Sequence, residues 1–152
     1  MKKLLIISTL TFSILGCSNE PEIVLPDVKQ VDIKNDQEII DRAISKNYSL
    51  LEGTDSLDAP SKIYKYDHNS QIELSKNYIL ISWQQHDQTS MDRAIVVAMS
   101  TLGKDGGFFI HEVDRLGKVD KRPINGHEVV NSFCAGESCM MKMALLHKGL
   151  KG

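Results

Sequence analysis

Cysteine and histidine side chains near the carboxyl end are the groups in this sequence best suited to specific chemistry. Four residues separate Cys134 from Cys139, with His127 upstream and His147 downstream. Zinc favours such ligands, but gaps of six residues before Cys134 and seven after Cys139 match no familiar zinc spacing. A redox centre is a second alternative, because a helix N-terminus stabilises a thiolate, yet C-x-x-x-x-C is not the thioredoxin-type C-x-x-C. We therefore assign no metal ligands and no cofactor, and both alternatives stay open.

A second group with chemical potential is His111 and Glu112, followed by Asp114. If this stretch is a strand, Glu112 and Asp114 project from the face opposite His111, and paired carboxylates can transfer protons. Such a pair is more often a solvated polar face. The sequence has no nucleophile elbow, no H-E-x-x-H, no phosphate-binding glycine loop and no dinucleotide fingerprint. We therefore assign no catalytic residue and expect that the protein is not an enzyme.

The amino end has the order of a secretory signal peptide over residues 1–16. Lys2 and Lys3 form a positive end, and an apolar run of twelve residues, broken only by Ser and Thr, extends from Leu4 to Leu15. A membrane-spanning helix needs about 20 apolar residues, so this run is too short to be one.

The four residues Ile14-Leu15-Gly16-Cys17 resemble the lipobox of bacterial lipoproteins. In that family the peptide is cut before the Cys, whose thiol carries diacylglycerol and whose amino group is usually acylated. The resemblance implies that Cys17 is the lipid-bearing membrane anchor of the mature protein. Because Ser18 follows, rather than the Asp that favours inner-membrane retention, it implies the periplasmic face of the outer membrane.

If the lipid occupies Cys17, the other two cysteines form an even pair in an oxidising compartment. Within one α-helix their spacing would hold the side chains too far apart to bond. A disulfide between Cys134 and Cys139 therefore requires a turn, which Gly136 suits, and we expect this bond.

Composition and charge are those of one exported globular domain. The hydrophobic content is 41% and the charged content 25%. Removing residues 1–16 leaves 136 residues with 16 basic and 20 acidic side chains, and no basic run suggests a nucleic-acid partner. Residues 17–34 contain two prolines and predict an extended tether, with an edge strand over 23–25 as the alternative. Residues 35–152 then form a single domain.

Hydrophobic periodicity predicts an α+β fold, in which an N-terminal helix packs on an antiparallel β-meander and a short helix closes the chain. Asn35 and Glu38 form a capping-box pattern for a helix over 35–52. A Met-, Ala- and Leu-rich stretch predicts a helix over 139–148, or a final strand paired with 129–133. The elements expected between the helices are strands at 62–66, 71–74, 78–83, 94–99, 108–113 and 129–133, a loop at 86–93, and turns at 102–107, 115–118 and 125–126.

These features favour a lipid-anchored interaction protein of the cell envelope. An immunity or inhibitor protein, or an accessory component of a secretion, conjugation or assembly system, would fit one small domain. One alternative is a hydrolase of an envelope polymer that uses His111, Glu112 or His127. The other is a lipoprotein that binds a small ligand or metal at its cysteine- and histidine-bearing carboxyl end.

Overall fold

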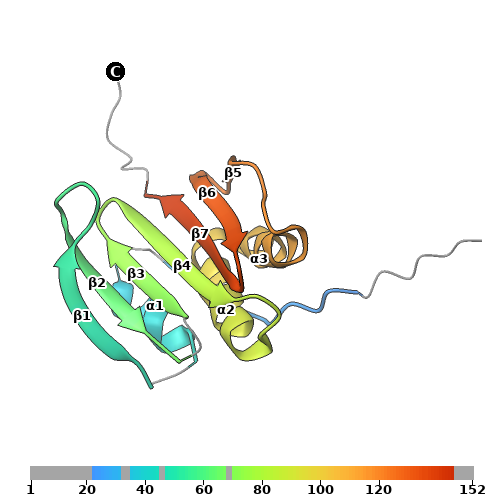
Figure 1. Cartoon of the computed structure of the whole chain (residues 1–152), viewed down its shortest axis with the longest axis horizontal. Coiled ribbons are helices and arrows are strands. Elements are labelled where there is room, and N and C mark those ends of the chain that lie inside the picture. Colours follow the sequence, from blue (N-terminus) through green and yellow to red (C-terminus); the bar gives the residue numbers. More distant parts are fainter. Residues whose placement is uncertain (1–21, 32–34, 45–46, 68–69, 146–152) are drawn as a thin grey trace, which may run out of the picture.

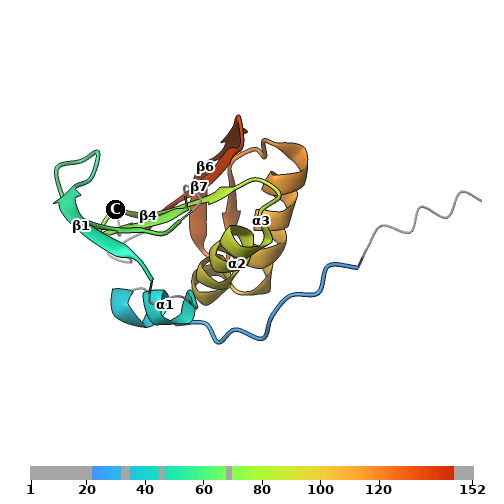
Figure 2. The same cartoon turned by 60° about the horizontal axis from the view of Figure 1, so that its bottom comes forward.

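A seven-stranded antiparallel sheet with helices on one of its faces is the framework of the protein (Figures 1 and 2). The computed structural model describes residues 22–31, 35–44, 47–67 and 70–145. The helices in these residues are α1 (Asp36–Arg42), α2 (Gln88–Leu102) and α3 (Lys104–Leu116). The strands are β1 (Ser49–Thr54), β2 (Pro60–Lys65), β3 (Gln71–Ser75), β4 (Tyr78–Gln84), β5 (Arg122–Ile124), β6 (His127–Ala135) and β7 (Ser138–Ala144).

The strand order is β1-β2-β3-β4-β7-β6-β5, and all neighbours are antiparallel. β1 to β4 form a meander, α2 and α3 follow, and β5 to β7 return so that β7 lies beside β4. Ile81 lies opposite Met141 in this central pairing. The predicted α+β class with an antiparallel sheet is confirmed, as are the predicted strands at β2, β3, β4 and β6.

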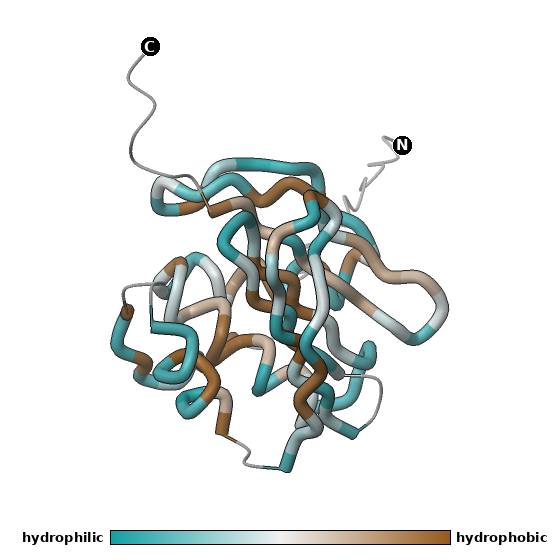
Figure 3. Tube along the Cα trace, turned by 90° about the vertical axis from the view of Figure 1, so that its left-hand side faces the viewer, coloured by the Kyte–Doolittle hydropathy of each residue, from teal (hydrophilic) through white to brown (hydrophobic). Residues whose placement is uncertain are grey.

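The core lies between the helices and the sheet face that they cover. Alternate strand residues point to this face, as the two-residue period of a strand requires. In Figure 3 the hydrophobic stretches (brown) run mostly through the middle of the molecule and the hydrophilic ones (teal) lie mostly in loops. The largest fully buried side chains are Ile39, Ile40, Tyr64, Ile72, Ile79, Ile81, Trp83, Met99, Leu102, Phe109, Ile110 and Met141.

The first helix is shorter than the predicted helix over 35–52. Asn35 caps it as expected, but α1 ends at Arg42, and the end of the predicted helix forms β1. The ring of Tyr48, expected on the helical apolar stripe, packs edge-on against Tyr64 of β2 with 5.0 Å between ring centroids. Pairing with β2 therefore outweighs the local helical preference.

The stretch 94–99, predicted as a strand buried on both faces, lies in the middle of α2. The helix starts after Asp87, whose carboxylate accepts the backbone N–H of Ser90 at 2.8 Å, so the predicted loop at 86–93 is also mostly helical. Nearly every residue from Ser90 onward is buried, because α2 packs against α1, α3 and β4. A helix buried all round has no polar face, so its sequence lacks the 3.6-residue period and resembles a buried strand.

Gly106 lies inside α3, where a turn over 102–107 and a strand over 108–113 were predicted. A Cβ atom at Gly106 would lie 2.5 Å from the backbone oxygen of Ala98, so α2 and α3 approach each other backbone to backbone. The predicted turn and strand are wrong because this glycine serves close helix packing, not chain reversal.

The predicted C-terminal helix over 139–148 is also wrong, since these residues form β7 as far as Ala144. The alternative, a final strand paired with 129–133, is confirmed by the β6–β7 ladder. Met141 and Met143 are fully buried while the residues between and beside them are half-buried, which is the two-residue period of a strand.

The segment before α1 packs on the domain instead of forming a tether throughout. Its backbone N–H at Val31 donates to the carbonyl oxygen of Ser100 in α2 at 2.8 Å. The tether predicted over 17–34 is therefore wrong for residues 25–31, and the alternative strand over 23–25 is not formed. The side chains of this segment that pack against the core are Leu25, Val28 and Val31.

Candidate functional site

Asp114, in the last turn of α3, is the centre of a polar cluster at one end of the sheet. Its side chain is only 11% exposed. Its Oδ1 accepts hydrogen bonds from Nε1 of Trp83 at 3.0 Å and from the backbone N–H of His86 at 3.3 Å. Nδ1 of His86 lies 3.2 Å from Oδ2, and Nε2 of Gln85 donates to the backbone oxygen of Asp114 at 2.7 Å. One carboxylate thus joins the end of β4, the following loop and α3.

A carboxylate beside a histidine is the arrangement that supports a general base. Catalysis by nucleophilic attack needs a third group. The hydroxyl of Ser90 is engaged by the backbone, because it lies 3.2 Å from the carbonyl oxygens of Gln84 and Asp87, to which it can donate, and accepts from the N–H of Gln84 at 3.0 Å. The His86 side chain is 75% exposed. The cluster therefore fits a structural clamp better than a catalytic site. Sequence reasoning missed the pairing because the two partners are 28 positions apart.

The residues named for the hydrolase alternative are not hydrogen-bonded to one another. Glu112 forms an ion pair with Arg122 at 2.5 Å. Burial lowers the pKa of His111, although the negative charges of Asp114 and Asp92 oppose this shift. His127 begins β6, and its buried Nδ1 has no hydrogen-bond partner among the described residues.

A disulfide joins Cys134 and Cys139, which face each other directly across the β6–β7 hairpin. The turn between them contains Gly136 with a left-handed φ of 61°, as the expected turn requires. The bond closes the β6–β7 hairpin, whereas the predicted helix over 139–148 would have placed it between a strand and a helix. The backbone N–H of Cys134 also donates to the oxygen of Gly117 at 2.6 Å, which ties the hairpin to the end of α3.

This position is unfavourable for redox chemistry. Sγ of Cys134 lies 3.6 Å from the carbonyl oxygen of Val113, near the C-terminal end of α3. The carbonyl end of a helix destabilises a negative charge, and the carboxylate of Asp114, the next residue after Val113, would also repel a thiolate. A thiolate at Cys134 would therefore gain no electrostatic support.

Two of the four groups considered for zinc, Cys134 and Cys139, are joined in the disulfide. Among the described residues, no group of three or more histidine, cysteine or acidic side chains is placed to hold a metal ion. His147 and the proposed lipid-bearing Cys17 lie outside the described residues.

The most prominent candidate interface is the β1 edge, which we define as the free side of residues Ser49–Thr54. Within the part of the chain that the structure describes, β1 pairs only with β2, and all six of its residues are exposed. Leu50 and Leu51 point to opposite faces of the sheet, and each is 45% exposed. The ladder to β2 is continuous, and the strand has no proline and one charge, Glu52. It therefore lacks most of the devices that prevent pairing with another strand.

On the sheet face opposite the helices, side chains of β4, β3 and β7 contact one another and the loop between β1 and β2. Tyr78 donates its hydroxyl hydrogen to Glu73 at 2.8 Å, and the ammonium of Lys142 lies 3.7 Å from the Tyr78 ring centroid. The same ammonium lies 3.4 Å from Oγ of Ser56, in the loop between β1 and β2. This loop therefore bends over one end of that face.

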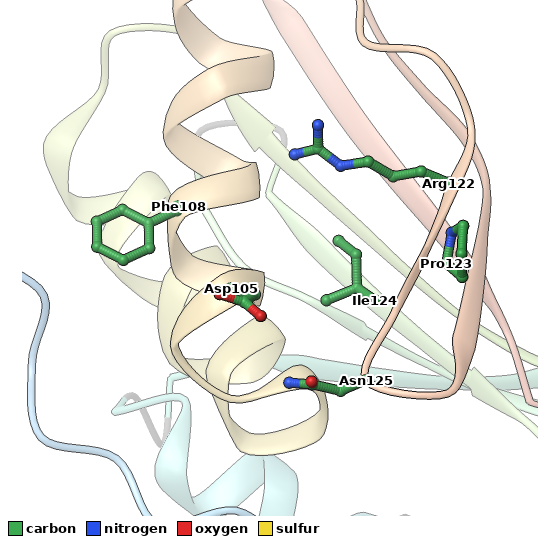
Figure 4. A pocket seen from close by; sticks show the side chains of 6 residues that line it. All are labelled: Asp105, Phe108, Arg122, Pro123, Ile124 and Asn125. Atoms are coloured by element: carbon green, nitrogen blue, oxygen red, sulfur yellow. The ribbon is translucent and has the colours of Figure 1, made fainter.

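An open pocket of about 290 Å³ lies between the start of α3 and β5 (Figure 4). It is lined by Asp105, Phe108, Arg122, Pro123, Ile124 and Asn125. Arg122 is held by Glu112 and by the Phe109 ring, and the side chain of Asn125 donates to the backbone oxygen of Leu102. Because Arg122 and Asn125 are already engaged, the pocket offers few side-chain donors that would orient a small ligand.

No known family model, curated protein or solved structure matches this chain. None of the described helices is long and apolar enough to cross a bilayer. The functional argument therefore depends on the residues and surfaces above.

Proposed function

We propose that this protein is a lipid-anchored, periplasm-facing interaction protein of the bacterial cell envelope that binds a partner protein along the β1 edge. The exposure of β1 along its whole length carries the proposal. An edge strand offers unpaired backbone donors and acceptors that an extended segment of another protein can satisfy, while Leu50 and Leu51 offer apolar contacts. The lipobox resemblance supports attachment to the outer membrane through Cys17.

Two kinds of envelope protein suit such a surface. An immunity or inhibitor protein acts by covering part of a periplasmic toxin or hydrolase. An accessory lipoprotein of a secretion, conjugation or assembly system acts by holding one component of that system. Both need a stable domain with one free recognition surface and no catalytic group.

Capture of the partner from native membranes tests the β1 edge. We expect the double variant Leu50→Lys, Leu51→Lys to weaken capture about tenfold or more, because edge lysines oppose strand addition. Leu57→Lys is the matched control, since Leu57 is 69% exposed in the neighbouring loop and outside the edge. Amide hydrogen exchange should slow in β1 when the partner is bound. Equal capture by all three proteins, or unchanged exchange in β1, would refute the interface.

Lipidation is tested separately with Cys17→Ser. Metabolic labelling with a fatty acid should mark the wild-type protein and not the variant, and membrane fractionation should find the variant uncleaved or released. Equal labelling of the two proteins would contradict the anchor.

The hydrolase alternative now depends on the His86–Asp114 pair and is tested by complementation of a deletion strain. We expect Ala substitutions at His86, His111 and His127 to leave function intact. Complete loss of function in one variant with unchanged stability would favour an enzyme instead.

A further inference from the structure

The chain enters the folded domain beside α3. A Cβ atom at Gly107 would lie 3.0 Å from Cδ2 of Leu25, so Leu25 packs directly on this helix. The two residues before it are exposed, with Ile23 at 43% and Val24 at 86%. Leu25 is therefore the point where the chain between the proposed anchor and the domain becomes fixed.

The length of that chain limits how the domain can face the membrane. Seven residues separate Cys17 from Leu25, so the link spans at most about 28 Å when fully extended. A domain of this size has a diameter of roughly 35 Å and half a circumference of roughly 55 Å. The link is too short to pass halfway around the molecule, so the side opposite Leu25 and α3 cannot rest on the lipid. The side that bears Leu25 and α3 is the one that the anchor holds nearest to the membrane.

The exposed side of α3 has the composition of a membrane-facing surface. Phe108 is 46% exposed and Leu116 is 54% exposed. At 100° per residue, the exposed Lys104 and Arg115 lie within about 40° of Phe108 around the helix axis. Two acidic residues share this side: Glu112, about 40° away, is paired with Arg122, and the exposed Asp105 lies about 60° away. In Figure 4 the Phe108 ring points outward, away from Arg122 and Ile124 and toward the side where the N-terminal segment passes. Apolar side chains flanked by basic ones suit the boundary between lipid headgroups and acyl chains.

We propose that the anchor-side surface, consisting of Ile23, Val24, Phe108 and Leu116 with Lys104 and Arg115, rests on the lipid bilayer that holds Cys17. This inference depends on the lipidation in the proposed function. The lipid keeps the surface within reach of the bilayer, so weak apolar and electrostatic contacts suffice to orient the domain.

The orientation has a consequence for partner binding. α3 packs against β6 and β7, whereas β1 is the opposite edge of the sheet from β5. Six strand spacings of about 4.8 Å separate the two edges. Figure 2 shows the N-terminal segment leaving on the α3 side while β1 lies at the far side of the sheet. The β1 edge is thus held away from the membrane, where a periplasmic protein can reach it.

Tryptophan fluorescence of the intact lipoprotein tests this orientation. Trp83 is the only tryptophan and is 0% exposed, so it gives a constant background. Phe108→Trp places a reporter on the anchor-side surface, Leu116→Trp provides a second one, and Leu57→Trp in the exposed loop between β1 and β2 is the matched control. Each protein is placed in vesicles of phosphatidylethanolamine and phosphatidylglycerol with a brominated phosphatidylcholine as quencher.

We expect quenching of Phe108→Trp and Leu116→Trp to exceed that of Leu57→Trp about twofold or more. Equal quenching in all variants, with mass spectrometry showing lipid on Cys17, overturns the orientation and leaves the anchor intact. Absence of lipid on Cys17 overturns the anchor and this inference together. A third outcome is that neither brominated lipid nor aqueous iodide quenches the reporters and that cross-linking yields a dimer. That result would show that a second copy of the protein covers the surface, and it would also overturn the orientation.

Discussion

Trp83 donates a hydrogen bond of 3.0 Å from its indole Nε1 to the carboxylate of Asp114, across 31 positions of sequence. Trp83 is fully buried beside β7, where it lies opposite Cys139, and Asp114 is buried as well. The same carboxylate oxygen accepts the backbone N–H of His86, which has a left-handed φ of 62°. A buried acceptor thus fixes the indole and a strained loop together, so its removal leaves buried donors without partners.

Asp114→Ala should lower the free energy of unfolding by about 2–3 kcal/mol, because it leaves the Trp83 Nε1–H unpaired in the core. Urea unfolding followed by circular dichroism measures the change. Asp120→Ala, at an exposed position just beyond α3, is the control and should change stability by less than about 0.5 kcal/mol. Equal changes in the free energy of unfolding for the two variants would show that the hydrogen bonds of Asp114 do not stabilise the fold.

Gly106→Ala should destabilise the protein by about 1–3 kcal/mol, although alanine is the better helix former. The added methyl group would lie 2.5 Å from the oxygen of Ala98 and would force α2 and α3 apart. At Gly53 nothing lies within 4 Å of the corresponding position, so Gly53→Ala should be neutral or slightly stabilising. Thermal unfolding of both variants checks the sign, and a stabilised Gly106→Ala would show that the helices are further apart.

Acid stability should depend on Asp55. Burial raises the pKa of this carboxyl, but hydrogen bonds from the Ala59 N–H, the Asn77 amide, Ser75 and the Leu57 N–H outweigh it and lower the pKa from 3.8 to about 2. The folded state binds the proton less tightly than the unfolded chain, so the stabilisation is complete above pH 3.8 and is lost as the pH falls toward 2.

Urea unfolding between pH 2 and pH 5 tests this linkage. Asp55→Asn should be less stable than the wild-type protein at neutral pH and should lose less stability on acidification through this range. Asp58→Asn, in the same loop and exposed, is the control and should retain the acid dependence of the wild type. Parallel pH profiles for Asp55→Asn and the wild type would contradict the assignment.

The sequence correctly predicts those strands in which the alternation of apolar and polar residues matches the alternation of buried and exposed side chains in the fold. In β3 and β4, residues such as Ile72 and Ile81 alternate with half-buried neighbours, and this period can be recognised without the rest of the chain. The run Ile95-Val96-Val97 is different, because β-branched residues favour a strand and a completely buried helix offers no opposing polar face. The N-cap at Asp87 was the local signal that could have identified α2.

Other features were not accessible from local patterns. A glycine in a tight turn and a glycine at a close helix contact look the same in the sequence. Only the three-dimensional position of Ala98 shows that Gly106 belongs to a helix contact. Likewise no spacing rule joins Trp83 or His86 to Asp114, since the contact depends on how α3 packs against the end of β4. The cysteine pair could be predicted because its partners are close in sequence and need only a turn.

The disulfide should form in the exported protein and contribute about 2 kcal/mol to stability, since it closes a ring of only a few residues in the unfolded chain. Mass spectrometry of the mature protein, alkylated without reduction, should show a deficit of about 2 Da in the peptide that contains Cys134 and Cys139.

The variant Cys134→Ser, Cys139→Ala places the smaller apolar residue at the buried position, and it should match the chemically reduced wild type in urea unfolding. Folding should persist in both, because the β6–β7 ladder and the bond from Cys134 N–H to Gly117 remain. Two freely alkylated thiols in the exported protein would reject the bond, and zinc in the same sample would restore the metal site with His127 and His147.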